Sequence, residues 1–174
     1  MTQKRCFPPV VDANTRVLVL GSLPGEVSLA QSQYYAHKQN RFWYLMGEVI
    51  GRDLAGIDYD ARLQMLLLHR VGLWDVVAQA QRQGSLDSNI RNHASNDLIA
   101  LVESLPQLVA IAFNGGTAAR LVMRALQDAA GQYQFISLPS SSAAHTKPYA
   151  EKLHAWQALR AWVVETDTQR TTED

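Results

Sequence analysis

Aromatic, cationic and amide side chains are concentrated in one short stretch, residues 34–43, called here the aromatic segment. It reads Tyr-Tyr-Ala-His-Lys-Gln-Asn-Arg-Phe-Trp, so ten residues carry four aromatic rings, three basic side chains and two amides. Aromatic rings stack on planar molecules, and amide or cationic groups bind their polar edges. The aromatic segment therefore predicts recognition of a planar polar ring. Asn40 is its most informative polar residue, although it could equally cap the helix that follows.

Two further polar stretches follow predicted strands. Asn114-Gly115-Gly116 follows the apolar run 108–113, and Pro-Ser-Ser-Ser-Ala-Ala-His at 139–145, called here the serine loop, follows the run 134–138. An amide at a strand end can read a ring edge with both a donor and an acceptor, and hydroxyls and a histidine can bind phosphate. The alternatives are that Asn114 caps a helix and that the serine loop is an ordinary solvent-exposed loop.

Apolar periodicity predicts the elements that must position these side chains. We expect strands at 16–20, 72–77, 108–113 and 134–138, and helices at 42–50, 59–69, 95–105 with Ser95 as N-cap, after Gly116, and at 148–164. Residues 1–15 are expected to be an irregular lead-in, 21–40 and 81–94 loops, and the tail from 165 frayed. Strands alternating with helices predict one α/β domain over residues 1–174, a three-layer αβα sandwich with a central, mainly parallel four-stranded sheet.

In such sheets, ligands bind at the carboxyl ends of the strands. The turn Gly21-Ser22-Leu23-Pro24-Gly25 ends the first strand, and the other two polar stretches end the last two. All three should open on the same edge. Their convergence there points to a binding site more strongly than any one of them does.

Composition limits the function further. The chain has 174 residues, 47% of them apolar, and a formal net charge of zero, which argues against coating a nucleic acid by charge alone but permits a local contact. No apolar run is long enough to span a membrane. The single cysteine, Cys6, excludes an intramolecular disulfide and a cysteine-ligated iron–sulfur cluster, and the histidines show no metal-binding spacing. We expect no cofactor, no metal and no membrane association.

Taken together, these residues resemble the uracil-DNA glycosylase superfamily over roughly residues 16–160. The stretch 35–43 is similar to a loop of its mismatch-specific members. The turn 21–25 and the stretch Leu-Pro-Ser-Ser-Ser-Ala-Ala-His at 138–145 are similar to the hypoxanthine-DNA glycosylase branch. Mismatch-specific members have an asparagine where this chain has Leu23, and uracil-specific members have a histidine where it has Leu138. The hypoxanthine branch is expected to take its catalytic amide from the other loop, which points to Asn40.

The resemblance implies a monofunctional DNA glycosylase of base excision repair that flips a deaminated base, most simply hypoxanthine, out of double-stranded DNA and hydrolyses its N-glycosidic bond. The implied site residues are as follows: catalytic, Asn40 and His145; base-binding, Tyr35, Asn114 and Leu23; phosphate-binding, Ser28, Ser140, Ser142, Lys38 and Arg41. The catalytic amide could be Asn40, Asn114 or both. A monomer in the cytoplasm, associated with the nucleoid when on DNA, is expected.

Three alternatives stay open from the sequence. One is a glycosylase directed at uracil or mismatched uracil. Another is a DNA-lesion-binding module with weak catalysis, which Leu23 and Leu138 favour. The third is a hydrolase of free nucleosides, which the serine loop and the cations of the aromatic segment disfavour. A panel of bases in defined duplexes tests the first, lesion binding without base release would indicate the second, and inosine hydrolysis without DNA would indicate the third.

Overall fold

The computed structural model describes residues 3–5, 7–81, 91–129 and 131–163, which fold around a parallel sheet. The sheet has the strand order β3-β2-β6-β7, and each neighbouring pair is parallel. Its strands are β2 (Val17–Gly21), β3 (Val71–Asp75), β6 (Ala110–Asn114) and β7 (Gln134–Leu138). The predicted central, mainly parallel four-stranded sheet is confirmed.

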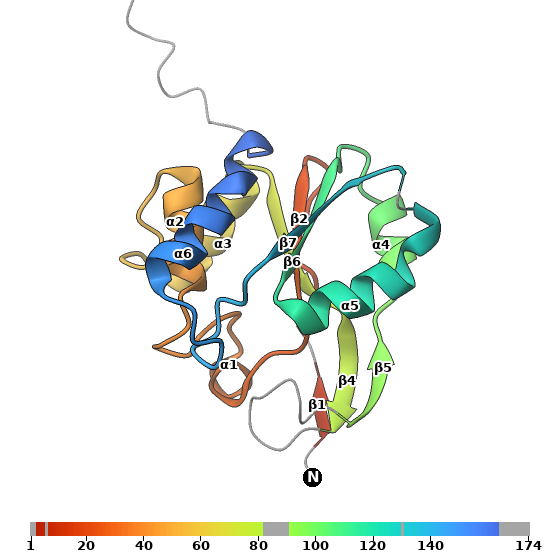
Figure 1. The fold of residues 1–174 in the computed structure, drawn as a ribbon, viewed down its shortest axis with the longest axis horizontal. Coiled ribbons are helices and arrows are strands. Elements are labelled where there is room, and N and C mark those ends of the chain that lie inside the picture. The colour runs from red at the N-terminus through yellow and green to blue at the C-terminus, as the bar shows by residue number, and fades with distance from the viewer. Residues whose placement is uncertain (1–2, 6, 82–90, 130, 164–174) are drawn as a thin grey trace, which may run out of the picture.

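Helices cover both faces of this sheet (Figure 1). One face carries α2 (Phe42–Ile50), α3 (Tyr59–Leu68) and α6 (Tyr149–Trp156). The other carries α4 (Leu98–Glu103) and α5 (Gly116–Ala125). The predicted three-layer arrangement is therefore confirmed. No helix in the described ranges combines the length and apolarity needed to cross a bilayer.

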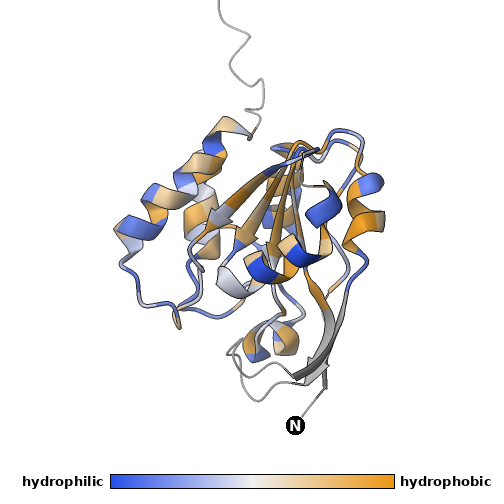
Figure 2. Cartoon of the chain, turned by 45° about the vertical axis from the view of Figure 1, so that its right-hand side comes forward, coloured by the Kyte–Doolittle hydropathy of each residue, from blue (hydrophilic) through white to orange (hydrophobic). Residues whose placement is uncertain are grey.

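The central strands are apolar because both of their faces are covered. All five residues of β2 are buried, and its side chains alternate between two cores. Val17 and Val19 pack under α2 and α6, whereas Leu18 and Leu20 pack under α4 and α5. In Figure 2 the strands of the parallel sheet are mostly hydrophobic, whereas the helices carry both hydrophilic and hydrophobic residues.

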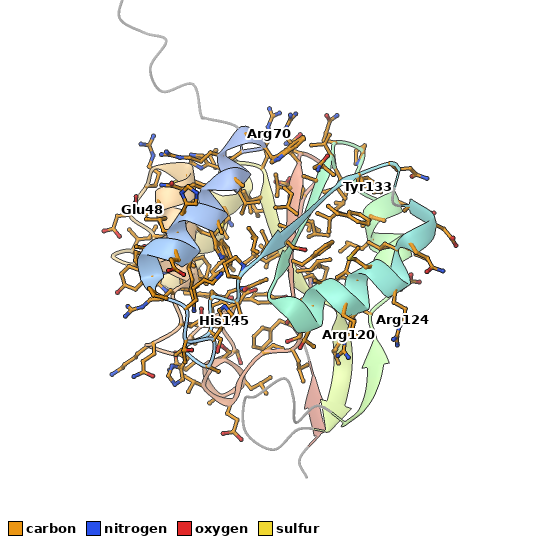
Figure 3. All side chains as sticks on the ribbon, in the orientation of Figure 1. Glu48, Arg70, Arg120, Arg124, Tyr133 and His145 are labelled. Atoms are coloured by element: carbon orange, nitrogen blue, oxygen red, sulfur yellow. The ribbon has the colours of Figure 1, made fainter. Side chains whose placement is uncertain are left out.

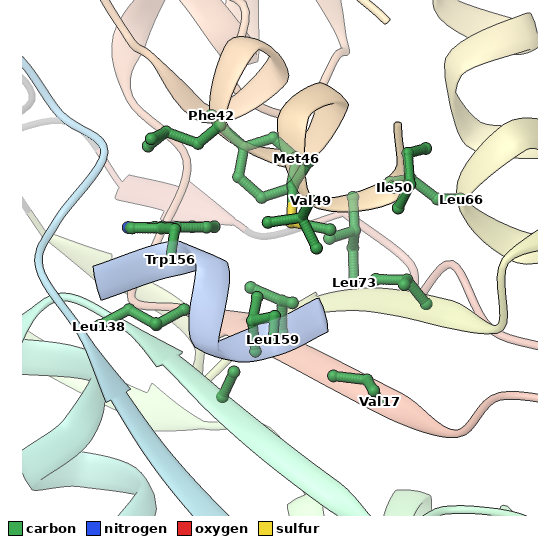
Figure 4. Packing of buried hydrophobic residues seen from close by; sticks show 14 of the residues in the cluster. Val17, Phe42, Met46, Val49, Ile50, Leu66, Leu73, Leu138, Trp156 and Leu159 are labelled. Atoms are coloured by element: carbon green, nitrogen blue, oxygen red, sulfur yellow. The ribbon is translucent and has the colours of Figure 1, made fainter. Parts of the chain in front are cut away.

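The larger core lies between the sheet and α2, α3 and α6 (Figure 4). Phe42, at the first position of α2, is completely buried and lies edge-on to both Trp43 and Trp156. The Trp156 Nε1–H donates to the carbonyl oxygen of Pro139 at 2.9 Å, so this core also holds the start of the serine loop. The end of α2 agrees with the prediction, because Gly51 adopts the left-handed conformation with φ 72°.

A second, smaller sheet was missed by the sequence analysis. It contains β1 (Gln3–Arg5), β4 (Val77–Gln81) and β5 (Arg91–Ser95), in the order β1-β4-β5 with antiparallel pairing. The expectation of an irregular lead-in over 1–15 is wrong at β1, and the expected loop over 81–94 is wrong at β5. β1 and β5 are polar and short, so they lack the apolar alternation on which strand prediction depends. The tail from 165 lies outside the described residues, as do residues 82–90.

Smaller corrections concern helix ends. A short helix, α1 (Glu26–Gln31), lies inside the expected loop 21–40. The N-cap of α4 is Asp97, whose Oδ1 accepts from the Ala100 N–H, and Ser95 instead ends β5. After α5 comes a single 3₁₀ turn, η2 (Gln127–Ala129), and the last predicted helix, 148–164, divides into α6 and a 3₁₀ turn, η3 (Gln157–Ala161).

Phe42→Ala should lower the free energy of unfolding by about 3–5 kcal/mol, because it removes a fully buried ring and leaves a cavity in the larger core. The matched control is Leu68→Ala on α3, where the side chain is 58% exposed and the change should stay within about 0.5 kcal/mol. Urea unfolding measures both. A loss below about 1 kcal/mol for Phe42→Ala would contradict the packing described.

Candidate functional site

The predicted convergence of strand ends is confirmed by the register of the sheet. Gly21 at the end of β2 lies opposite Asp75 at the end of β3, and Asn114 at the end of β6 lies opposite Leu138 at the end of β7. The serine loop and the turn after Gly21 therefore leave the sheet at one edge.

A reciprocal pair of hydrogen bonds joins β6 to the serine loop. Asn114 Nδ2 donates to Ser141 Oγ at 2.9 Å, and the Ser141 N–H donates to Asn114 Oδ1 at 2.9 Å. Both residues are buried. The predicted capping alternative is wrong, because the N-cap of α5 is Gly115 and makes no side-chain cap, and the Asn114 amide instead holds Ser141. Among described contacts, one N–H of that amide is left for another partner.

The aromatic segment is bound to the same serine. The Arg41 N–H donates to the Ser141 carbonyl oxygen at 2.9 Å, which brings Asn40 beside the serine loop. Asn40 Oδ1 accepts from the Phe42 N–H at 3.0 Å, so this half-buried side chain stabilises the start of α2. The N-cap itself is Arg41, which makes no side-chain cap, so Asn40 supports the helix from the position before the cap rather than as the predicted N-cap. The Asn40 oxygen keeps a second lone pair for another hydrogen bond.

The Tyr35 side chain lies at the same edge of the sheet, beside the end of β2. Its ring stacks on Phe42 with 3.9 Å between centroids and 19° between planes, so only its other surfaces can meet a ligand. Tyr35 has φ 54°, a conformation that costs a non-glycine residue about 1–2 kcal/mol. Its hydroxyl lies near Gly21: a Cβ at Gly21 would be 3.0 Å from Tyr35 Oη and 2.7 Å from Asp75 Oδ1. Glycine at 21 lets these two side chains approach the strand.

The predicted basic residues lie on the outside of the same edge. His37, Lys38, Arg41 and His145 are all exposed, and Figure 3 shows His145 on the chain beyond β7. The His37 Nδ1 accepts from the Gln39 N–H at 3.1 Å, which fixes the ring within the aromatic segment. The Arg41 guanidinium lies 5.7 Å from the centroid of the Tyr44 ring. These side chains are placed where an approaching anion could reach them.

The predicted phosphate-binding serines differ in their surroundings. Ser28 is buried in α1 and its Oγ accepts from the Ala36 N–H at 2.9 Å, so it supports the aromatic segment from within. Ser140 Oγ accepts from the Ser142 N–H, and Ser142 Oγ accepts from the Ala144 N–H, both at 3.2 Å. Those two hydroxyls are half-buried and still carry a hydrogen to donate.

Leu23, predicted to contact the base, is 7% exposed. It packs with Val77 and the half-buried Leu121 in a small apolar cluster beside the edge. A ligand could touch only the small part of Leu23 that stays accessible, so its main role in this structure is packing.

Sequence reasoning missed Lys152. It is 3% exposed, and its Nζ donates to the Ser142 carbonyl oxygen at 3.0 Å. Burial and the nearby Arg41 charge lower its pKa. One signal was available: Lys152 lies four residues before Trp156, and thus one turn away on the same face of α6. Ser141, the middle of three consecutive serines, carried no such signal.

Hydrogen bonds of Tyr34 and Tyr59 hold the aromatic segment against the protein interior. The Tyr34 N–H donates to the Tyr59 hydroxyl at 2.9 Å, and Tyr34 itself is buried with its hydroxyl donating to the Pro8 carbonyl oxygen. Burial raises the pKa of Tyr59, so the phenol stays neutral at physiological pH. Within the described residues, no group of three or more His, Cys, Asp or Glu side chains could hold a metal ion.

Comparison with known proteins identifies the family. The sequence pattern of the Uracil DNA glycosylase superfamily matches residues 8–160. A protein of Methanosarcina barkeri named hypoxanthine DNA glycosylase is 38% identical over 156 residues, covering 88% of this chain and 96% of the relative. A protein of Methanosarcina acetivorans with the same name is 40% identical over 158 residues, covering 90% and 97%.

The fold is shared as well. The solution NMR structure of a putative uracil DNA glycosylase from Methanosarcina acetivorans matches with a TM-score of 0.81 at 40% identity, covering 91% of this chain and 97% of that one. The chain belongs to the uracil DNA glycosylase superfamily.

Proposed function

We propose that this protein is a DNA glycosylase that releases hypoxanthine from deoxyinosine in double-stranded DNA. The observation that carries the proposal is the junction at Ser141, where Asn114 and the backbone of Arg41 hold the serine loop against the aromatic segment. That junction brings a ring-stacking surface, an amide and a set of hydroxyls to one sheet edge. Membership of the superfamily and the names of two relatives support the same activity.

The substrate must leave the duplex before it can react. Flipping a nucleotide costs a few kcal/mol, and least at a weak pair. Hypoxanthine, the product of adenine deamination, pairs poorly with thymine and is therefore easier to extrude. The flipped ring would lie against the exposed part of Tyr35, and the remaining N–H of Asn114 would donate to its polar edge. Ser140 and Ser142 would donate to phosphates beside the flipped site, with Lys38 and Arg41 at its rim.

Cleavage then proceeds at the sugar. The N-glycosidic bond breaks with its electron pair going to the base, and the sugar becomes oxocarbenium-like. A water oxygen then bonds to C1′, and the proton that this water loses passes through solvent to the departing base, which leaves as neutral hypoxanthine. The Asn40 oxygen, already fixed by the Phe42 N–H, would orient this water and stabilise the positive sugar through its dipole. His145 would offset charge on the departing base or on a flanking phosphate. The products are free hypoxanthine and an abasic site in an uncut strand.

Uracil is the second candidate base, because the matching solved structure is titled a putative uracil DNA glycosylase. Leu23 and Leu138 stand where uracil-excising members have an asparagine and a histidine, which favours hypoxanthine. Single-turnover release from duplexes carrying one hypoxanthine or one uracil decides between them. Hypoxanthine should be released at least tenfold faster. Faster uracil release would transfer the proposal to uracil, and release of neither would leave a lesion-binding protein.

Asn40→Ala should reduce the single-turnover rate of hypoxanthine release by about 100-fold or more, since one preorganised electrostatic group typically contributes that much. The neighbouring Gln39→Ala removes an exposed amide and is the control. Because Asn40 also supports the start of α2, thermal unfolding must accompany the assay, and a loss of about 0.5–2 kcal/mol is expected. A rate within a few-fold of wild type would exclude Asn40 from catalysis.

Gly21→Ala should slow hypoxanthine release by displacing the Tyr35 and Asp75 side chains, which a Cβ would meet at 3.0 and 2.7 Å. We expect a loss of roughly tenfold to 100-fold, the effect of misplacing a substrate by about 1 Å. In the control Gly131→Ala, the added Cβ has nothing within 4 Å, and release should be unchanged. Equal rates for the two variants would show that the approach of Tyr35 to Gly21 has no part in the reaction.

A further inference from the structure

Lys152 is a buried cation that the mechanism above does not use. Its side chain is 3% exposed, although lysine is almost never fully buried unless it is paired. Among the described residues no carboxylate lies within ion-pair distance, and its one hydrogen-bond acceptor is the Ser142 carbonyl oxygen. Burying a charge in this way costs stability. A buried lysine whose charge lowers stability is a candidate for a functional role.

The acceptor of Lys152 is the central carbonyl of the serine loop. The Ser142 oxygen accepts from Lys152 Nζ at 3.0 Å and from the His145 N–H at 3.1 Å. Lys152 therefore supports the turn that runs from Ser142 to His145. Ser141, one residue earlier, is held by Asn114 and by the Arg41 backbone. The serine loop is thus held by β6 through Asn114, by the aromatic segment through Arg41, and by α6 through Lys152.

The charges around Lys152 leave room for an anion. Its ammonium has three N–H donors, of which one is used on Ser142 among the described contacts. Arg41 is the other charged group that acts on it, and the two positive charges repel, lowering the pKa of Lys152 after the larger effect of burial. An anionic group at the serine loop would offset the repulsion between Lys152 and Arg41 and would stabilise the buried ammonium of Lys152.

We propose that Lys152 is a positioning residue that holds the serine loop in its DNA-binding shape and supplies, with Arg41, the positive charge that attracts one DNA backbone phosphate to it. This inference rests on the proposed DNA glycosylase function. It differs from the assignment of the serines as hydrogen-bond donors, because the charge comes from α6, beneath the loop. The chain has zero formal net charge, so local cations of this kind must supply its attraction to DNA.

The test compares Lys152→Met, which keeps the apolar stem and removes the charge, with Lys152→Arg, which keeps the charge. Arg160→Met removes one positive charge from an exposed position on η3 and is the control for net charge. Fluorescence anisotropy on a hypoxanthine-containing duplex gives the dissociation constant at several salt concentrations. Single-turnover assays give the maximal rate and half-saturating enzyme concentration, and thermal unfolding reports folding.

Lys152→Met should bind the duplex about tenfold more weakly and lower the slope of log affinity against log salt by about one, the signature of a lost phosphate contact. Its thermal midpoint should equal or exceed that of wild type, because an unpaired buried charge has been removed. The half-saturating concentration should rise more than the maximal rate falls. Lys152→Arg should recover most of the affinity, and Arg160→Met should stay within about twofold.

Unchanged affinity and salt slope in Lys152→Met would overturn the inference, as would equal losses in Lys152→Met and Lys152→Arg. If Lys152→Met does not fold, Lys152→Gln is judged by the same criteria. The binding assay separates this inference from the proposed function. A wild type that binds the duplex and releases no base would refute the glycosylase while the Lys152 comparison still stands, whereas a wild type that binds no DNA would refute both.

Discussion

The reciprocal hydrogen bonds between Asn114 and Ser141 are the constraint on which the rest of the edge depends. They are buried, so losing either partner would leave a polar group without water or protein to satisfy it, at a cost of about 1–3 kcal/mol. Because the Ser141 carbonyl oxygen also accepts from Arg41, the same residue sets the position of the aromatic segment. The end of β6, the serine loop after β7 and the aromatic segment are therefore all held together at Ser141.

Much of the fold was readable from the sequence, and the reason is burial. Strands with both faces covered are continuous apolar runs, and the predicted strand 16–20 agrees with β2, whose five residues are all buried. Helix 42–50 was predicted equally well because Gly51 ends it. The sheet β1-β4-β5 was not readable, because Gln3–Arg5 and Arg91–Ser95 are polar and find their partners only in the folded chain.

The candidate site was predictable in residue type but not in hydrogen bonding. Asn40, Tyr35 and Asn114 were chosen for their chemistry, yet each is also used in the scaffold: Asn40 supports α2, Tyr35 stacks on Phe42, and Asn114 holds Ser141. Nothing in three consecutive serines indicates that the middle one is buried. That depends on where β7 ends and on which residue of β6 lies opposite, which are properties of the sheet.

The order of strands also governs when the site can come into existence. Val17 pairs with Val71 on one side and with Ala110 on the other, so β2 waits for partners made much later in synthesis. Such long-range pairing makes folding slow. Arg41, Asn114, Ser141 and Lys152 are joined only once α6 has been made. Lys152 is the last of these residues to be synthesised, so its hydrogen bond to the serine loop cannot form before the last helix has been made.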